Sequence, residues 1–323
     1  MHAAVLTEPG LSPAYTTHPD PVPAAEGTLV RVTAAPIVPL DLLCATGTSY
    51  FGRPAVPYVP GVQGVGVVER SGRFAEGTRV WFATAAGMAP GNGSLAELCA
   101  VPDPDVVPLP VGVEDHDMAA LGLSAVAAWM ALTWRAGLQP GEHVLVLGGG
   151  GAVGQSAVGA ARLLGAGRVV AACRSAAAQE RARAAGADAV VPLTGNVDEL
   201  AARLAEATGG RLDVVVDPVF GVPATAAVRA LSEQGRLVNL GGSAGDAAEF
   251  SSALVRSRSI AVLGYTNNAL TQAQRNEAIR TVGEHAAAGR LSVAHRVRPL
   301  AEAADAWAGE AAGGTGARVV LAP

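Results

Sequence analysis

A cluster of glycines gives the clearest chemical signal in this chain. Gly149, Gly151 and Gly154 have the spacing Gly-x-Gly-x-x-Gly and directly follow the apolar run 144–147. In this pattern the first glycine permits a tight turn, the second lets backbone approach a pyrophosphate, and the third lets a helix pack on a strand. An ordinary glycine-rich strand–helix turn is the alternative. We predict a dinucleotide site whose residues are Gly149, Gly150, Gly151, Ala152, Val153 and Gly154.

The kind of nucleotide should be decided near the end of the second strand, about 20 residues further on. Proteins that bind NAD place a carboxylate there for the ribose hydroxyls. In this chain no acid occurs between Arg168 and Glu180, and Arg174 and Ser175 stand in that place. A guanidinium can pair with a 2′-phosphate, and a serine hydroxyl can add a hydrogen bond. We therefore predict NADPH as the cofactor; the alternative is NADH, with Arg174 as a solvated side chain.

The absence of one residue type excludes several kinds of chemistry. The chain contains no lysine, so all 23 residues counted as Lys or Arg are arginine. Schiff-base catalysis, a phosphate-binding P-loop lysine and a serine–lysine nucleophile are thereby excluded. The Tyr-x-x-x-Lys pair of short-chain dehydrogenases is excluded as well.

Composition limits the partners of the chain. The formal net charge is −5 and the sequence pI is about 5.7, which gives no reason to expect nucleic acid or an anionic membrane. Three scattered cysteines form no Cys-x-x-Cys pair, as is usual in a reducing compartment. Neither a signal peptide nor an uninterrupted apolar run of membrane-spanning length is visible. We expect a cytoplasmic protein.

The pattern of the chain changes near residue 120, which predicts two domains of an α/β protein. Residues 1–120 are rich in proline and contain short β-rich runs, among them a strand expected at 95–101, which is typical of a partly open β-barrel. Residues 121–264 alternate apolar strands with helices, which predicts a Rossmann, doubly wound parallel sheet with strand order 3-2-1-4-5-6. Residues 265–323 should complete the first domain. Strands are expected at 144–147, 168–172, 189–191, 212–216, 236–240 and 259–263, helices at 117–136, 153–164, 176–185, 197–207, 271–288 and 301–312, and a last strand at 317–321.

Several segments in this order resemble the medium-chain dehydrogenase/reductase superfamily, and within it the zinc-free quinone oxidoreductases. They are Pro57–Val68 (PYVPGVQGVGVV), Gly93–Glu97 (GSLAE), Pro140–Val146 (PGEHVLV) and Gly235–Gly241 (GRLVNLG). The resemblance implies a small-chaperonin-like barrel, a Rossmann domain and an active site in the cleft between them. It also implies a homodimer.

The chain departs from the zinc-dependent branch of this superfamily. That branch has a cysteine in a Cys-x-x-Asp segment and a His-Glu pair after Pro-Gly. Here Val38 replaces the cysteine, and Val62 and Gln63 replace the histidine and the glutamate. Valine cannot ligate zinc. We therefore expect no metal. Quinone oxidoreductases usually have Asn-Pro-x-Asp at this point, and this chain keeps only Pro39 and Asp41 of that motif.

Without a metal, hydride transfer suits a conjugated carbonyl better than a simple ketone. Charge then builds on an oxygen that needs only hydrogen-bond donors and a proton. Tyr50, in a loop that resembles the family's substrate loop, is our candidate donor, and water is the alternative. Asp41 is the second catalytic candidate, because it could orient the active-site loop; a capping or buried hydrogen-bonded role is its alternative.

Residues after the later strands complete the predicted cofactor site. The resemblance implies that the loops of Asn239, Gly241, Tyr265 and Asn267 touch the nicotinamide half of the cofactor. The last strand of the sheet, near 259–263, is apolar, and an apolar edge is a liability unless it is paired. We therefore predict a homodimer that pairs these edges.

These observations together predict an NADPH-dependent, zinc-independent reductase. Its substrate would be a small, apolar molecule, either a quinone or an α,β-unsaturated carbonyl (enone), and a place in a biosynthetic pathway would suit the enone form. The first alternative is a non-catalytic NADPH-binding protein with a structural or sensing role. A methyltransferase that binds S-adenosylmethionine is the second, and the missing ribose-binding carboxylate weakens it.

Overall fold

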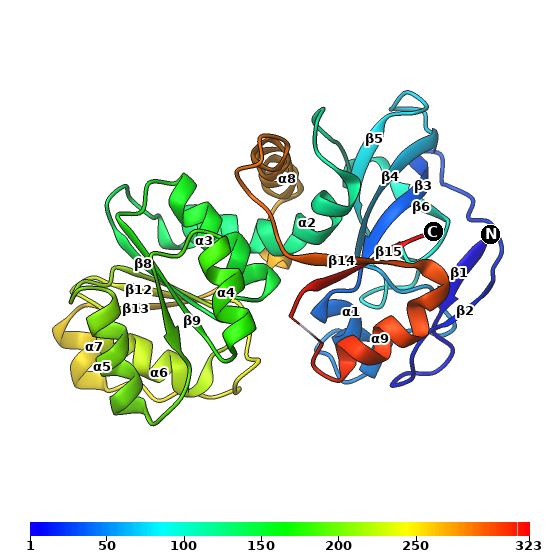
Figure 1. The fold of residues 1–323 in the computed structure, drawn as a ribbon. Coiled ribbons are helices and arrows are strands. Elements are labelled where there is room, and N and C mark those ends of the chain that lie inside the picture. Colours follow the sequence, from blue (N-terminus) through cyan, green and yellow to red (C-terminus); the bar gives the residue numbers. More distant parts are fainter. Residues whose placement is uncertain (315) are drawn as a thin grey trace. The chain divides into compact units, whose positions relative to one another are not determined.

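The computed structural model describes residues 1–314 and 316–323, and its chain forms two compact units (Figure 1). The first unit comprises Met1–Gly122, Gln272–Ala288 and Ala294–Pro323, and the second comprises Leu123–Thr271 and Gly289–Val293. The chain first passes between them two residues beyond the boundary predicted at 120. The segments 265–271 and 289–293 group with the second unit, whereas the prediction assigned the whole tail to the first.

The first unit is built on an open, mostly antiparallel sheet. Its strands follow the order β14-β15-β3-β4-β5-β7, and β6 pairs with β3 outside this path. The separate strands β1 and β2 form an antiparallel pair. The bounds of its strands are β1 (His2–Val5), β2 (Ala14–Thr17), β3 (Gly27–Pro36), β4 (Gln63–Arg70), β5 (Arg79–Ala83), β6 (Leu98–Pro102), β7 (Val106–Pro108), β14 (His295–Pro299) and β15 (Arg318–Ala322). Its helices are α1 (Pro39–Thr46), α8 (Gln272–Ala287) and α9 (Ala303–Ala311), with 3-10 turns η1 (Asp103–Asp105) and η4 (Leu300–Glu302).

The prediction placed one strand of this unit too early. The expected strand 95–101 begins at Leu98 as β6. The three preceding residues contact β1 instead: Ala3 bridges Ala96, and the Ala4 N–H donates to the Leu95 carbonyl at 2.8 Å. Pairing with β1 turns this stretch away from β3, which the alternation of side chains does not reveal.

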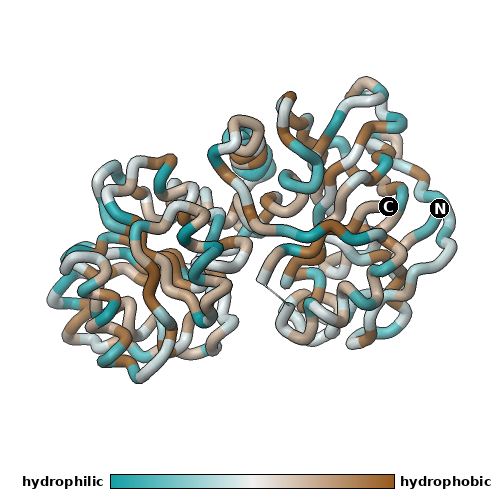
Figure 2. Tube along the Cα trace, viewed as in Figure 1, coloured by the Kyte–Doolittle hydropathy of each residue, from teal (hydrophilic) through white to brown (hydrophobic). Residues whose placement is uncertain are grey.

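The second unit is a doubly wound sheet of six parallel strands, in the predicted order. Its strands lie in the order β10-β9-β8-β11-β12-β13, which is 3-2-1-4-5-6 counted from β8. The three central strands are buried throughout or nearly so, and Figure 2 shows hydrophobic residues along them. Helices on both faces explain why these strands read as continuous apolar runs. The strands are β8 (His143–Leu147), β9 (Arg168–Cys173), β10 (Ala189–Pro192), β11 (Val214–Asp217), β12 (Arg236–Asn239) and β13 (Ala261–Gly264).

Three helices of the second unit, at 152–163, 176–184 and 197–207, lie within one residue of their predicted bounds, whereas its helices at 221–230 and 252–257 were not predicted. Helix α4 starts at an N-cap serine, Ser175, which accepts from the Ala178 N–H, and α5 starts at a capping box of Asn196 and Glu199. These signals are local, which is why the sequence reveals them. The helices are α3 (Ala152–Leu163), α4 (Ala176–Ala184), α5 (Val197–Ala207), α6 (Gly221–Ala230) and α7 (Ser252–Ser257), with the 3-10 turn η3 (Asn267–Ala269).

The helix predicted at 117–136 is broken. It consists of α2 (Asp115–Met130) and the π-helical η2 (Ala131–Ala136), and the backbone of Gly122 is not helical (φ 30°, ψ −130°). A Cβ atom at Gly122 would lie 2.1 Å from Oε1 of Gln63, whose side chain fills that space. Only glycine fits this close approach. The contact joins residues far apart in sequence, so periodicity could not predict it.

The stretch Asp115–Ala136 has the length and composition to cross a membrane. Its mean hydropathy over the most apolar window is 1.3, and 61% of that window is buried in the structure. This finding corrects the expectation from the sequence, which was that no stretch of membrane-spanning length exists. A mostly buried core helix passes the same length and composition criteria, so this stretch is weak evidence for a membrane span.

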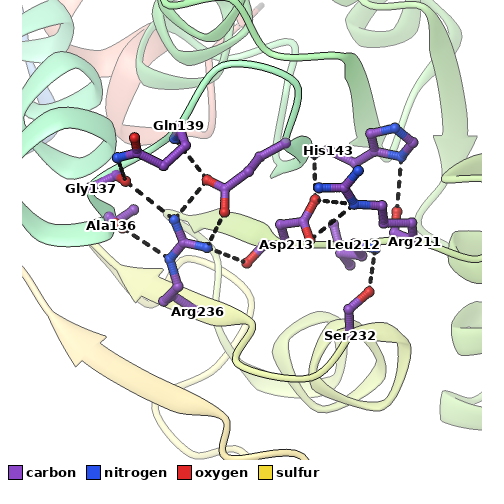
Figure 3. Close-up of polar contacts among 10 residues, drawn as sticks. Ala136, Gly137, Gln139, His143, Arg211, Leu212, Asp213, Ser232 and Arg236 are labelled. Carbon is purple, nitrogen blue, oxygen red and sulfur yellow. Dashed lines mark hydrogen bonds and ion pairs between the residues drawn. The ribbon is translucent and has the colours of Figure 1, made fainter.

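A polar network fixes the amino-terminal edge of the parallel sheet (Figure 3). Both terminal nitrogens of Arg236 bind the Glu142 carboxylate, at 2.7 and 2.8 Å, and its Nε donates to the carbonyl of Ala136 at 2.9 Å. Burial alone would raise the pKa of Glu142, but the hydrogen bonds from Arg236 and from the Gln139 N–H lower it. This two-pronged pair attaches the turn before β8 to the start of β12, and the Nε hydrogen bond attaches the end of η2 there. The opposite edge of the sheet is left for the predicted site.

Candidate functional site

The predicted cofactor residues follow the carboxyl ends of parallel strands. The glycine turn follows β8, Arg174 follows β9, Asn239 ends β12, and Tyr265 follows β13. Carboxyl ends of parallel strands share one edge of a sheet, and ligands of doubly wound folds bind there, where the strand order reverses. In this sheet that point lies between β8 and β11.

The glycine turn leaves space at one position and none at another. A Cβ atom at Gly154 would lie 2.2 Å from the Gly148 carbonyl oxygen, so no side chain fits where α3 crosses its own turn. Gly151 is exposed, and the nearest atom to a Cβ there is 3.6 Å away. Gly151 is the N-cap of α3, and the first N–H groups of a helix have no acceptor within it. We call the open space at Gly151, beside these N–H groups, the open cradle. It fits the pyrophosphate of a dinucleotide.

Arg174 and Ser175 lie between β9 and α4. Arg174 is exposed and makes no hydrogen bond or ion pair with any other described residue. The Ser175 hydroxyl accepts from the Ala178 N–H at 3.2 Å, so it caps α4. The cap leaves the serine hydroxyl hydrogen available to a ligand. A free guanidinium beside a helix N-terminus is a suitable place for a phosphate.

The loops after β11 and β12 hold one another. The buried Asp217 carboxylate accepts from the N–H groups of Val219, at 3.0 Å, and Phe220, at 2.7 Å. The Asn239 side-chain amide donates to the Gly241 carbonyl at 2.8 Å and to the Asp217 carbonyl at 3.2 Å. Asp217 thus shapes the turn, and Asn239 and Gly241 are held beside it.

Tyr265 and Asn267 bind each other. The Tyr265 hydroxyl donates to Oδ1 of Asn267 at 2.7 Å, and the Asn267 amide donates to the Leu123 carbonyl at 3.1 Å. Burial raises the pKa of Tyr265, which keeps its hydroxyl protonated. This chain of hydrogen bonds attaches the loop after β13 to α2.

In the first unit, Asp41 ties two loops together. Its side chain is 2% exposed, and its carboxylate accepts from the Val38 N–H and the Val62 N–H, each at 2.9 Å. The acceptor oxygens are different, so both are committed. Burial raises the pKa of Asp41 to about 6, although these hydrogen bonds and the nearby Arg318 oppose the rise. Asp41 therefore acts on the backbone of the predicted active-site loop.

Tyr50 differs sharply from the neighbouring Tyr58. Tyr50 is 75% exposed and packs against Phe51, with ring centroids 4.3 Å apart and the ring planes tilted by 38°. Tyr58 is buried in the core, and burial raises its pKa, with Asp41 and Cys44 adding to the rise. No hydrogen bond joins Tyr50 to Asp41 in the part of the chain that the structure describes.

Comparison with known proteins identifies the family to which the chain belongs. Residues 24–111 match the family model described as alcohol dehydrogenase GroES-like domain, and residues 152–284 match the one described as zinc-binding dehydrogenase. The structure of a Thermus thermophilus quinone oxidoreductase, also solved with NADPH, is 30% identical with a TM-score of 0.83, over 100% of both chains. A mycobacterial quinone oxidoreductase structure is 25% identical with a TM-score of 0.88, again over 100% of both chains.

The chain belongs to the quinone oxidoreductase-like branch of the medium-chain dehydrogenase/reductase superfamily. A further relative is a component of the phenolphthiocerol/phthiocerol polyketide synthase of Mycobacterium tuberculosis, which is 31% identical over 309 residues. That match covers 93% of this chain but only 14% of the synthase component, so the chain spans a small part of that relative.

Valines stand at two positions where the resemblance implies zinc ligands in the zinc-dependent branch. Val38 and Val62 are both buried, and their N–H groups hold Asp41. Among the described residues there is no group of three or more His, Cys, Asp or Glu side chains that could hold a metal ion.

Sequence reasoning missed two residues that hold the glycine turn. The side chain of Gln155 donates to the Gly150 carbonyl at 3.0 Å, and Nε of Arg181 donates to the same oxygen at 2.8 Å. Gln155 is a buried polar residue in an otherwise apolar helix, which was an available signal. Arg181 gave none, because only the packing of α4 brings it back to the turn.

The raised pKa of Asp41 predicts a pH dependence of stability. Between about pH 4 and pH 6 the folded chain keeps a proton on Asp41 that the unfolded chain releases, so the free energy of unfolding falls as the pH rises. Relative to an Asp41→Asn variant, the wild type should lose at most about 3 kcal/mol over this range. Urea unfolding of both proteins at pH 4, 5, 6 and 7 measures the difference. A difference that is constant with pH would contradict the buried, proton-holding carboxyl.

Proposed function

We propose that this chain is an NADPH-dependent reductase that needs no zinc and transfers hydride to a quinone or an enone. The observation that carries the proposal is the glycine turn, with its open cradle at Gly151, beside the exposed Arg174. The quinone oxidoreductase relative that was solved with NADPH supports the choice of cofactor.

The chain's own groups fit the parts of NADPH. The N–H groups of Ala152, Val153 and Gly154 would hold the pyrophosphate, and Arg174 and Ser175 would hold the 2′-phosphate. Asn239 and Gly241, with Tyr265 and Asn267, would border the nicotinamide half. The bound cofactor supplies the hydride, and the protein orients it.

The substrate class follows from the absence of a Lewis acid among the proposed groups. Two electrons enter a conjugated carbonyl compound as hydride on its electron-poor carbon, and a proton neutralises the charge that develops on the oxygen. The exposed Tyr50 hydroxyl would give this proton, and Asp41 would act as a positioning residue through Val38 and Val62. The similarity to part of a polyketide synthase supports the enone form and a biosynthetic role.

Removing the charge of Arg174 should change nucleotide selectivity. The Arg174→Ala variant should bind NADPH about ten to a hundred times more weakly, because a charge-assisted phosphate contact is lost. Binding of NADH should change little. Fluorescence titration of both proteins with both nucleotides measures the ratio of dissociation constants. If the wild type prefers NADH, or if the variant keeps its preference for NADPH, the assignment of Arg174 is wrong.

Turnover tests the reductase itself. After treatment with EDTA, the protein should oxidise NADPH steadily in the presence of a small apolar enone or a benzoquinone. If Tyr50 gives the proton, Tyr50→Phe should lower kcat about a hundredfold and leave the KM for NADPH unchanged. Unchanged turnover would assign the proton to water. Nucleotide binding without turnover of either substrate would favour a non-catalytic NADPH-binding protein.

We also propose a homodimer that pairs the β13 edges. Val262 in the middle of β13 is 41% exposed, and an apolar edge strand promotes pairing with another chain. Light scattering at micromolar concentration should give twice the chain mass of 32.2 kDa. A Val262→Lys variant should shift the protein toward monomer. A wild type of single-chain mass would refute this assembly.

A further inference from the structure

The carbonyl of Gly150 is held from two sides. Nε of Arg181, on α4, donates to it at 2.8 Å, and the side-chain amide of Gln155, on α3, donates at 3.0 Å. Gln155 is buried, and Arg181 is half-buried. A carbonyl that accepts two side-chain donors cannot rotate without losing both.

The other backbone groups of the turn are also engaged. The Gly151 N–H donates to the Gly148 carbonyl at 3.0 Å, and the N–H groups of Gly148 and Gly149 donate to the Ala172 carbonyl at 2.8 and 3.2 Å. The peptide between Gly150 and Gly151 is therefore fixed at both its oxygen and its nitrogen. The first-turn N–H groups of α3 are left to face a ligand.

Helix α4 packs directly against the turn. A Cβ atom at Gly150 would lie 2.4 Å from the Ala178 carbonyl oxygen, so a side chain at Gly150 would push α4 away. Ala178 and Arg181 are three residues apart and share one face of α4. This packing places the Arg181 guanidinium over the Gly150 carbonyl.

We propose that Arg181 is a positioning residue for the pyrophosphate site. With Gln155, it holds the turn in the shape that presents the N-terminus of α3, before any nucleotide arrives. The pyrophosphate is common to NADPH and NADH, so Arg181 supports the binding of both by the same factor. Arg174, by contrast, would distinguish them. This inference rests on the proposed function, since it needs a dinucleotide ligand.

The alternative is that the charge of Arg181 attracts the 2′-phosphate. In that case its loss would weaken NADPH binding and spare NADH. The geometry favours the positioning role, because the atom that contacts the turn is Nε and its acceptor is a backbone carbonyl.

Three substitutions of Arg181 separate the hydrogen bond from the charge. Arg181→Gln places an amide nitrogen where Nε lies, so it keeps the donor and removes the charge. Arg181→Met removes both. Arg181→Lys keeps the charge but has no nitrogen at the Nε position. Arg183→Met is the matched control, because Arg183 lies on the same helix and pairs at the surface with Glu180.

Three measurements are needed on each purified variant. Fluorescence titration gives the dissociation constants for NADPH and for NADH. Hydrogen exchange of residues 148–152 without nucleotide reports the order of the turn. Thermal unfolding shows whether each variant is folded; if Arg181→Met is not, Arg181→Lys takes its place.

The expected result is that Arg181→Met binds both nucleotides about tenfold more weakly, with an unchanged ratio between them. Its turn should exchange faster, while Arg181→Gln and the control should match the wild type. The inference fails if Arg181→Met binds as the wild type does, if only NADPH binding falls, or if Arg181→Gln is as weak as Arg181→Met. A wild type that binds neither nucleotide would refute the proposed function, whereas unchanged exchange in Arg181→Met would refute the positioning role alone.

Discussion

The second unit depends on how closely α3 passes over the turn from which it starts. Gly154 lies so near Gly148 that a Cβ atom would stand 2.2 Å from the Gly148 carbonyl oxygen. This approach forces the chain into a tight turn whose backbone groups hydrogen-bond within the unit. It also aims the N-terminus of α3 over the carboxyl edge of the sheet. The anion binding that we propose for that edge would be a consequence of this one contact.

In the first unit, one buried carboxylate holds two distant loops together. Asp41 is buried and accepts from the backbone of two loops that are distant in sequence. Arg318, from the last strand, donates to the Ile37 carbonyl at 2.8 Å, next to the same loop. Val38 and Val62, whose N–H groups donate to this carboxylate, are themselves buried.

Much of the fold could be predicted because its signals are local. The glycine spacing, the apolar strands and the helix caps each lie within a few neighbouring residues, and the sheet order follows from their alternation. The break at Gly122, within α2, could not be predicted, since the residue that fills the space beside it is Gln63 on β4. The predicted start of the strand that became β6 was wrong for a similar reason. Ala96 pairs with β1, which is a long-range contact.

The candidate site also has a part that local patterns predict and a part that they do not. Residues 149–154, Arg174 and Ser175 lie where a local pattern placed them, after the ends of β8 and β9. What the pattern could not supply is the set of side chains that hold the turn, namely Gln155 and Arg181. Nor could it show that both oxygens of Asp41 are committed, or that Tyr50 is exposed while Tyr58 is buried. Each of these depends on tertiary packing, and the roles of these residues in binding and catalysis remain predictions.

A single substitution tests the central claim, that the open cradle at Gly151 holds the cofactor. Gly151 has φ −81° and ψ 172°, which alanine adopts freely, and its Cβ would meet nothing closer than 3.6 Å. The measurement is an NADPH titration of Gly151→Ala beside the wild type, with thermal unfolding of both proteins. We expect an unchanged unfolding temperature and NADPH binding at least about a hundred times weaker, because the methyl group fills the pyrophosphate's place. Equal NADPH binding by both proteins would contradict the account.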